Sequence, residues 1–189
     1  MTDSNFSFEK TFIEGVWVVT PFLRQDERGS FLKDYNEAVF HASGIDYRLR
    51  ETFYSFSKQN TVRGLHFQRE KQMPKLVRCL TGRIFDVAVD LRAGSPTFAK
   101  AYSVELSAAN SLSLLVPEGC AHGFLTLDDS LVSYKCGEIF YPEYDDGIRW
   151  DDPDIDVQWP LEASADVILS EKDAGLQSFL SFIDKYHSL

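Results

Sequence analysis

The segment RIFDVAVDL, residues 83–91, has the pattern that decides the fold class. Its side chains alternate between two sets. One set is wholly apolar and consists of Phe85, Val87, Val89 and Leu91. The other is mixed and consists of Ile84, Asp86, Ala88 and Asp90. A period of two places alternate side chains on opposite faces of a β-strand. We therefore expect a strand that separates two environments, such as a sandwich core and a lined cavity.

Short runs of this kind recur along the chain and are separated by turn residues. They lie at 16–22, 30–35, 52–57, 61–67, 75–80, 101–106, 113–116, 122–127 and 131–136. Breaks rich in glycine or proline, such as those at 94–96 and 117–119, lie between them. Many short strands with turns between them are typical of an antiparallel sandwich or barrel, so we predict an all-β fold.

Helices are expected at only two places. Asn36 is a suitable N-cap for a short helix that Gly44 would end. A second helix is predicted to begin at Ser170, because apolar residues follow it at helical spacing, namely Leu176, Phe179, Leu180 and Ile183. The chain is thus predicted to be one domain, residues 1–189, built mostly of strands and closed by a C-terminal helix.

Composition restricts the class of protein. The chain has 19 Lys and Arg against 29 Asp and Glu, a formal net charge of −10, which does not favour binding of nucleic acid or anionic lipid. No apolar run approaches the ~18 residues of a transmembrane helix, and the start MTDSNFSFEK lacks the apolar core of a signal peptide. Three cysteines without CxxC spacing suit reduced thiols. We expect a cytoplasmic protein with no nucleic-acid or membrane partner.

His66 is a candidate catalytic residue because of its neighbours in TVRGLHFQ (61–68). In a regular strand Arg63 and His66 would point to opposite faces, since they are three residues apart. Gly64 is a suitable place for a β-bulge, which can re-aim side chains and is common beside active sites. A half-buried structural histidine would also fit this strand.

His122 lies in PEGCAHGF (117–124), where it would open a strand after a turn. Cys120 is close enough in sequence to suggest a thiol–imidazole pair, but no residue that would activate its thiolate is evident. A zinc or iron site would need scattered ligands, because the chain has no HxH pair. We therefore expect neither a cysteine nucleophile nor a bound metal.

Two further candidates have ordinary structural explanations. Tyr134, in LVSYKC (131–136), can be a packing residue of a strand. Asp173 lies three residues after Ser170, close to the capping-box pattern, so its carboxylate can simply accept hydrogen bonds at a helix start.

Eight segments, taken in their order along the chain, form a recognisable pattern: DERGSF (26–31), TVRGLHFQ (61–68), PKLVR (74–78), GRIFDVAVDLRAGSPTF (82–98), PEGCAHGFL (117–125), SYKC (133–136), GIRWDDPDI (147–155) and LSEKDAG (169–175). Together they resemble the nucleotide-sugar 3,5-epimerases of the dTDP-4-dehydrorhamnose 3,5-epimerase family. The resemblance implies a cupin-type double-stranded β-helix, or jelly roll, with a few short helices. It also implies a homodimer whose subunits exchange N-terminal strands, and an activity without metal or other cofactor.

The resemblance also implies roles for individual residues. His66 would be the base that removes a proton, and Asp173 the carboxylate that orients it. Tyr134 would be the proton donor, and Lys75 the cation near the keto oxygen. The substrate, a nucleotide-diphospho-4-keto-6-deoxyhexose, would be bound by eight further residues, Arg28, Phe31, Lys33, Arg50, Thr52, Arg63, His122 and Asp145.

The chemistry of epimerisation fits these residue types. A hydrogen on the carbon beside a ketone is a feeble acid, so a base must act while a cation stabilises the enolate. An imidazole has an ordinary pKa of about 6.5 and is a suitable base near neutral pH. Inversion needs an acid on the other face of the sugar, and a phenol with a pKa near 10 is protonated at pH 7.

Three departures from the family pattern concern the nucleotide. Lys33 stands where these enzymes usually have a glutamate, residues 50–52 read RET in place of Q-x-N, and Asp145 replaces a common glutamate. An ammonium in place of a carboxylate reverses the hydrogen-bond polarity offered to a base. We hypothesise that 4-keto-sugar epimerisation is retained while the nucleotide need not be thymidine.

Five alternatives remain at this point. The chain can be an epimerase that acts at a single carbon, or on another nucleotide such as CDP, or a sugar-nucleotide 3,4-ketoisomerase on the same fold. It can also be a cupin that binds a sugar without catalysis, or a metal-dependent oxygenase.

Overall fold

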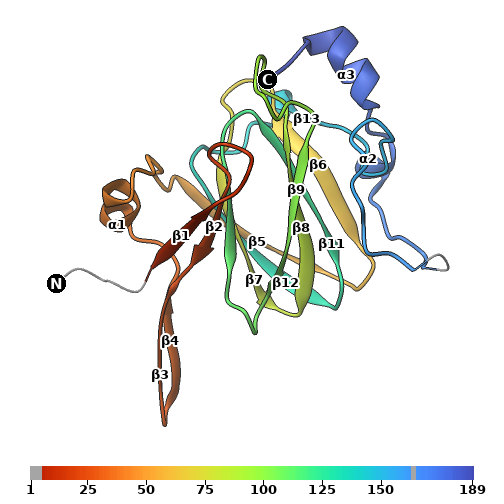
Figure 1. Ribbon diagram of the computed structural model, residues 1–189. Coiled ribbons are helices and arrows are strands. Elements are labelled where there is room, and N and C mark those ends of the chain that lie inside the picture. The colour runs from red at the N-terminus through yellow and green to blue at the C-terminus, as the bar shows by residue number, and fades with distance from the viewer. Residues whose placement is uncertain (1–5, 163–164) are drawn as a thin grey trace.

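Two antiparallel sheets face each other and form the jelly roll (Figure 1). The structure, a computed structural model, describes residues 6–162 and 165–189. Within these ranges one sheet has six strands, in the order β1 (Ser7–Lys10), β2 (Trp17–Thr20), β10 (Ser113–Val116), β7 (Lys75–Thr81), β12 (Ser130–Cys136) and β5 (Glu51–Ser57). The other has five, in the order β13 (Asp145–Gly147), β6 (Val62–Gln68), β11 (Cys120–Thr126), β8 (Arg83–Asp90) and β9 (Ala101–Ser107). The all-β prediction is confirmed.

Strand β8 separates two environments, as its alternation predicts. Its mixed face points between the sheets, where Ile84 and Ala88 join a core that includes residues of both sheets. Its apolar face points away from the other sheet and belongs to a second cluster of buried residues, among them Val87, Val89 and Phe182. The carboxylates of this strand are therefore directed to the interior of the sandwich.

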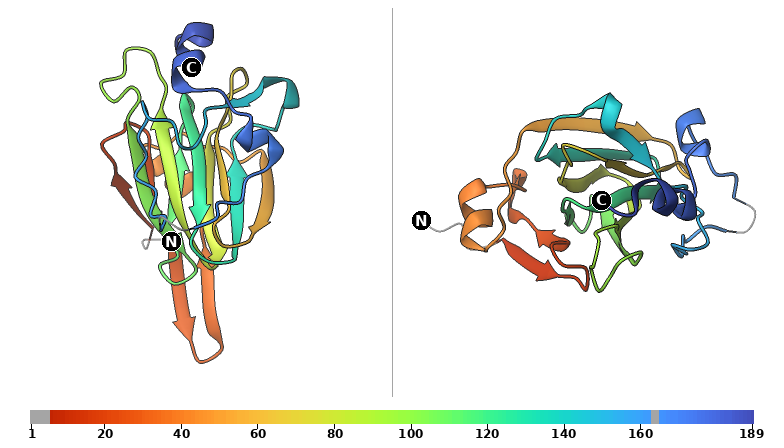
Figure 2. Two further views of the ribbon diagram at one scale, coloured as in Figure 1. Left: turned by 90° about the vertical axis from the view of Figure 1, so that its right-hand side faces the viewer. Right: turned by 90° about the horizontal axis from the view of Figure 1, so that it is seen from above.

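The C-terminal segment covers that outer face with two short helices, α2 (Glu171–Ala174) and α3 (Phe179–Tyr186) (Figure 2). The prediction of one helix from Ser170 is wrong in this respect. Gly175 ends α2, and the Ser178 side chain accepts a hydrogen bond from the N–H of Ser181 to begin α3. The buried stripe of α3 is accordingly shifted, so that Phe182 is fully buried and Leu180 is 60% exposed.

Helix α1 (Glu37–Ala42) covers part of the outer face of the six-stranded sheet. The Asn36 side chain accepts a hydrogen bond from the N–H of Val39, as its position before the helix predicts. Phe40 packs there against Val19 and Leu76 in a third buried cluster. No helix in the described ranges is long and apolar enough to cross a membrane.

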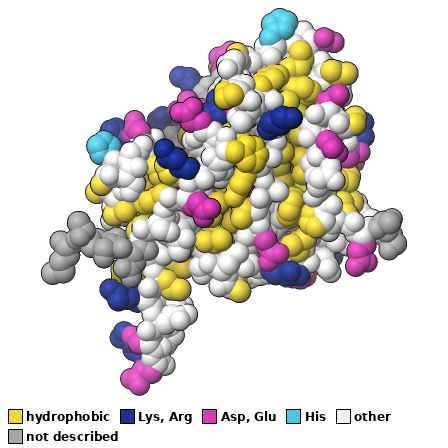
Figure 3. Space-filling view, in the orientation of Figure 1, with side chains coloured by type: hydrophobic (Ala, Val, Ile, Leu, Met, Phe, Trp, Pro, Cys, Tyr) yellow, Lys and Arg dark blue, Asp and Glu magenta, His cyan; other side chains and the backbone are white. Residues whose placement is uncertain are grey.

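A two-stranded hairpin, β3 (Phe22–Asp26) and β4 (Gly29–Lys33), stands out from the sandwich (Figures 1 and 2). The space-filling view shows charged side chains at its tip, where Asp26 and Arg28 form an exposed ion pair (Figure 3). Phe31 on β4 is 61% exposed. A short 3-10 helix, η1 (Pro142–Tyr144), leads into β13, which is the edge strand of the five-stranded sheet beside β6.

The packing of α3 against the sheet can be tested by replacing one buried and one exposed side chain of this helix with alanine. Phe182→Ala should lower the free energy of unfolding by about 3–5 kcal/mol, because it removes a fully buried ring. The matched control Leu180→Ala, on the exposed side of the same helix, should change it by no more than about 0.5 kcal/mol. Urea unfolding of both variants measures this, and equal losses would show that α3 does not cover the sheet.

Candidate functional site

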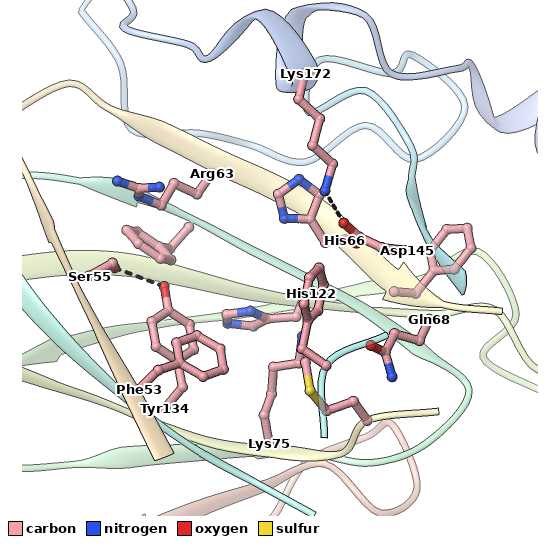
Figure 4. Close-up of a pocket in the computed structure, with 14 residues that line it drawn as sticks. Phe53, Ser55, Arg63, His66, Gln68, Lys75, His122, Tyr134, Asp145 and Lys172 are labelled. Atoms are coloured by element: carbon pink, nitrogen blue, oxygen red, sulfur yellow. Dashed lines mark hydrogen bonds and ion pairs between the residues drawn. The ribbon is translucent and has the colours of Figure 1, made fainter. Parts of the chain in front are cut away.

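The cavity between the two sheets brings together the chemistry-bearing residues of both (Figure 4). His66 and Arg63 reach it from β6, His122 from β11, and Lys75 and Tyr134 from β7 and β12 of the opposing sheet. Because each sheet presents one of its faces to this space, residues as distant in sequence as Lys75 and Tyr134 line the same wall. The sequence-predicted sugar-facing residues are therefore assembled in one place.

A β-bulge in β6 places Arg63 and His66 on the same wall. His66 lies opposite His122 in the neighbouring strand, and Arg63 lies opposite Phe124, so three steps along β6 match two along β11. Gly64 lies inside this bulge with a φ of +117°, and an added Cβ would be 2.6 Å from the Cα of Gly123. Only glycine fits there, because that conformation and that close approach both exclude a side chain. The bulge predicted at Gly64 is confirmed.

Asp173 contacts His66 and lies in the first turn of helix α2, whose N-cap is Ser170. Its Oδ1 lies 2.5 Å from His66 Nε2 and accepts a hydrogen bond from the Gly64 N–H at 3.3 Å. Ser170 Oγ donates to Asp173 Oδ2 at 2.6 Å and accepts from the Asp173 N–H at 3.0 Å. Burial opposes ionisation of Asp173, but the hydrogen bonds from His66, Ser170 and Gly64 outweigh it and lower its pKa to about 2. One carboxylate thus lies beside His66 and at the helix start, where it accepts from the Ser170 hydroxyl and not from a helix N–H as the capping-box pattern suggested.

Tyr134 lies on the wall opposite His66. Its hydroxyl is 3.2 Å from Ser55 Oγ, and its ring stacks on Phe53 with centroids 4.7 Å apart. Burial raises the pKa of Tyr134 above its ordinary value. The phenol is therefore held in a fixed orientation and keeps its proton at neutral pH.

Lys75 and His122 are both almost fully buried in the cavity wall. Burial lowers the pKa of Lys75, and the nearby Cys136, Asp145 and Asp86 oppose that effect. His122 Nε2 lies 2.8 Å from Asp86 Oδ1. Asp86 was not among the predicted site residues, because alternation along a strand shows which face a residue occupies and not which side chain it meets.

The mouth of the cavity has an ion pair between Lys172 of α2 and Asp145 of β13 (Figure 4). Asp145 was predicted as a substrate contact, and it lines the cavity. Lys172 was missed, although it directly precedes Asp173 in the segment LSEKDAG. Phe140 also lines the mouth and is 45% exposed, which leaves an aromatic surface open to solvent.

Five of the predicted substrate contacts do not line this cavity. Arg28, Phe31 and Lys33 lie on the protruding hairpin. Arg50 Nη1 pairs with Glu138 Oε2 at 2.7 Å, and Thr52 lies on β5 next to Phe53, which itself reaches the cavity. Their predicted roles stay predictions at this point.

Two findings concern the other chemistries considered from sequence. No group of three or more His, Cys, Asp and Glu side chains in the described ranges has the arrangement to hold a metal ion. Burial raises the pKa of the Cys120 thiol to about 12, so this thiol stays protonated at neutral pH. Cys120 also lies outside the set of residues that line the cavity.

The Asp173 contacts predict a specific dependence of stability on pH. Because the folded pKa of about 2 is below the ordinary value of 3.8, the carboxylate stabilises the fold above pH 4 and loses this effect as the pH falls towards 2. Asp173→Asn should therefore cost on the order of 2 kcal/mol of unfolding free energy at pH 6, and less as the pH falls.

Urea unfolding at several pH values measures that difference. The control Asp151→Asn breaks a more exposed pair with Arg149 and should cost no more than about 1 kcal/mol. A loss in Asp173→Asn that is the same at every pH would contradict the assignment of an ionised, stabilising carboxylate.

Comparison with known proteins identifies the family. A family model described as dTDP-4-dehydrorhamnose 3,5-epimerase matches residues 10–181. The dTDP-4-dehydrorhamnose 3,5-epimerase of Methanothermobacter thermautotrophicus is 50% identical over 171 residues, which cover 90% of this chain and 92% of that protein. The Escherichia coli protein of the same name is 43% identical over 170 residues, which cover 88% and 91%. The crystal structure of a dTDP-6-deoxy-D-glucose-3,5-epimerase from Legionella pneumophila, in complex with dTDP-4-keto-L-rhamnose, has a TM-score of 0.91 at 35% identity and 97% coverage of both chains. The chain therefore belongs to the dTDP-4-dehydrorhamnose 3,5-epimerase family.

Proposed function

We propose that the chain inverts C3 and C5 of dTDP-4-dehydro-6-deoxy-D-glucose to give dTDP-4-dehydro-L-rhamnose, without a cofactor. The observation that carries this proposal is the placement of His66 and Tyr134 on opposite sheets around one cavity. The names of the relatives that match the chain over most of its length support the substrate. The role of each site residue given below is part of the proposal.

His66 removes the proton from the carbon next to the keto group. The electron pair of the broken C–H bond moves into the C–C bond, and the carbonyl electrons move to the oxygen, which gives an enolate. Asp173, ionised at neutral pH, lies 2.5 Å from His66 and stabilises the imidazolium that forms. The carboxylate thus orients the base and offsets its new charge.

Lys75 stabilises the enolate oxygen. An ammonium buried in a wall from which water is largely excluded interacts with a developing negative charge more strongly than it would in bulk water. The loss of a comparable donor in other enzymes raises the barrier by about 2.7–4 kcal/mol. Its position on the six-stranded sheet places this charge beside the acid and across from the base.

Tyr134 returns a proton to the opposite face of the carbon. The phenol gives its proton to the enolate carbon and the carbonyl re-forms. Before the next proton abstraction the His66 imidazolium releases its proton to solvent, and the Tyr134 phenolate regains one from solvent. The same sequence at the second carbon completes the double inversion. If one residue both removed and returned the proton on one face, the starting configuration would be restored.

The nucleotide is proposed to be dTDP, and the site has cations for its diphosphate. Arg63 lines the cavity, and Arg28 on the hairpin provides a further guanidinium; both match the preference of phosphate for arginine. The names of the relatives favour dTDP over the other nucleotides left open by Lys33, Thr52 and Asp145.

The active unit is proposed to be a homodimer in which the hairpin of one subunit completes the site of the other. The hairpin residues Arg28, Phe31 and Lys33 stand away from the cavity of their own chain (Figure 1). The exposed ring of Phe31 and the two-stranded hairpin that carries it would be stabilised by contact with a second subunit.

Three buried, unpaired cysteines are consistent with a reducing compartment. We therefore place the enzyme, as a single domain per chain, in the cytoplasm.

Hydrogen exchange in deuterium oxide tests the assignment of base and acid. His66→Ala should lose exchange and product formation together, by at least about 10²-fold, because no base remains. Tyr134→Phe should still exchange a sugar C–H for deuterium with retention of configuration, but should form little product. Proton NMR of dTDP-4-dehydro-6-deoxy-D-glucose measures both.

The control His41→Ala changes an exposed histidine of α1 and should behave as the unmodified protein. Exchange at one carbon would favour a single-carbon epimerase, and movement of the keto group would favour a ketoisomerase. Product formed by His66→Ala at the normal rate would refute the proposed function.

Mixing of two impaired variants tests the shared site. Arg28→Ala and His66→Ala should each be weakly active alone, and their mixture should regain activity, because one site of each mixed dimer has an intact hairpin and an intact cavity. The chain should also sediment as a species of twice its 21.5 kDa mass. A monomeric mass, or a mixture no more active than its parts, would contradict the dimer.

A further inference from the structure

Asp86 is a buried carboxylate inside the sandwich to which the proposed mechanism gives no role. It lies on β8, is 0% exposed, and places Oδ1 2.8 Å from His122 Nε2. Its second oxygen, Oδ2, is buried without a hydrogen-bond partner. A carboxylate with one unpaired oxygen in the interior is costly, so its presence calls for a function.

The groups around Lys75 show which one can balance its charge. The charge of Lys75 on β7 is influenced by Cys136 of β12, Asp145 of β13, Asp86 of β8 and Lys172 of α2. Burial raises the pKa of Cys136 to about 11, so its thiol is neutral at pH 7. Asp145 already pairs with Lys172. Among these four groups, Asp86 is left as the negative charge that can offset the buried ammonium.

The groups around His122 lead to the same carboxylate. His122 of β11 faces Asp86, Lys75 and His66, and burial lowers its pKa, which favours the neutral ring. Burial raises the pKa of Asp86, and the hydrogen bond with His122 and the positive charge of Lys75 oppose that rise. A neutral His122 that donates Nε2–H to Asp86 has an unprotonated Nδ1, which is a hydrogen-bond acceptor.

We propose that Asp86 is a positioning residue of the epimerase, which fixes the His122 ring and its tautomer through Nε2 and holds the Lys75 ammonium in the cavity wall by its negative charge. This inference rests on the proposed function, because Lys75 is given its role there. Asp86 itself is not proposed to touch the substrate. It acts through the two residues that do.

The test compares two buried carboxylates of the same strand. Asp86→Asn keeps an acceptor for His122 but removes the charge, while Asp90→Asn changes a carboxylate that bonds Arg92, Ser95 and Thr97 and does not line the cavity. The rate of product formation is measured between pH 6 and 10 with dTDP-4-dehydro-6-deoxy-D-glucose. Thermal unfolding of both variants is recorded as well.

Asp86→Asn should lose activity at lower pH than the unmodified enzyme. Lys75 and Tyr134 must both keep their protons, and removal of a nearby negative charge lowers the pKa of each. The alkaline limb of kcat should move down by on the order of one pH unit, which is tenfold in kcat on that limb, with KM changed less than about threefold. Asp90→Asn should unfold at a lower temperature with its alkaline limb unmoved. The same limb in Asp86→Asn and the unmodified enzyme would overturn the proposal.

A second measurement does not depend on the folding of any variant. In the unmodified protein, ¹⁵N NMR of the labelled imidazoles should show His122 as the neutral Nε2–H tautomer between pH 6 and 9. An unprotonated Nε2 would mean that Asp86 holds the proton and carries no charge, which would also overturn the proposal. An inactive but folded enzyme would refute the proposed function instead, and the tautomer would then decide the role of Asp86 by itself.

Discussion

An imidazole and a phenol held on facing sheets are the arrangement on which the rest of this structure depends. His66 belongs to the five-stranded sheet and Tyr134 to the six-stranded sheet, so the width of the sandwich separates them. Strand pairing fixes each backbone, and the core between the sheets keeps the two walls at a constant distance. A ligand between them is therefore approached from two sides by groups that the fold itself holds apart.

Burial then sets the protonation states that this chemistry needs. It raises the pKa of Tyr134, which suits a proton donor, and it lowers that of Lys75, which must be offset by negative groups. Asp173 stays ionised in spite of burial because three donors surround its carboxylate. The contacts of each residue thus set its protonation state, so that a neutral phenol and an ionised carboxylate occur in the same site. This is common where acid and base chemistry share one cavity.

Much of the fold could be predicted from short-range patterns, and the errors have physical causes. The alternation over 83–91 predicts a strand with two environments, and Gly64 predicts the bulge that aligns Arg63 with His66. The helix predicted from Ser170 is broken at Gly175, because a spacing of apolar residues does not show where a cap interrupts it. Side chains that meet across the sheets, such as Asp86 and His122, leave no mark in the spacing of one strand. Arg28 and Phe31 could be associated with the substrate by resemblance, but they do not line the cavity of their own chain.

The most direct measurement is a crystal structure of this chain with dTDP-4-dehydro-L-rhamnose bound. The account predicts the His66 imidazole and the Tyr134 hydroxyl on opposite faces of the sugar ring, next to C3 or C5, with the Lys75 ammonium within hydrogen-bond distance of the 4-keto oxygen. A sugar that has both side chains on one face, or that lies outside the space between the two sheets, would contradict it.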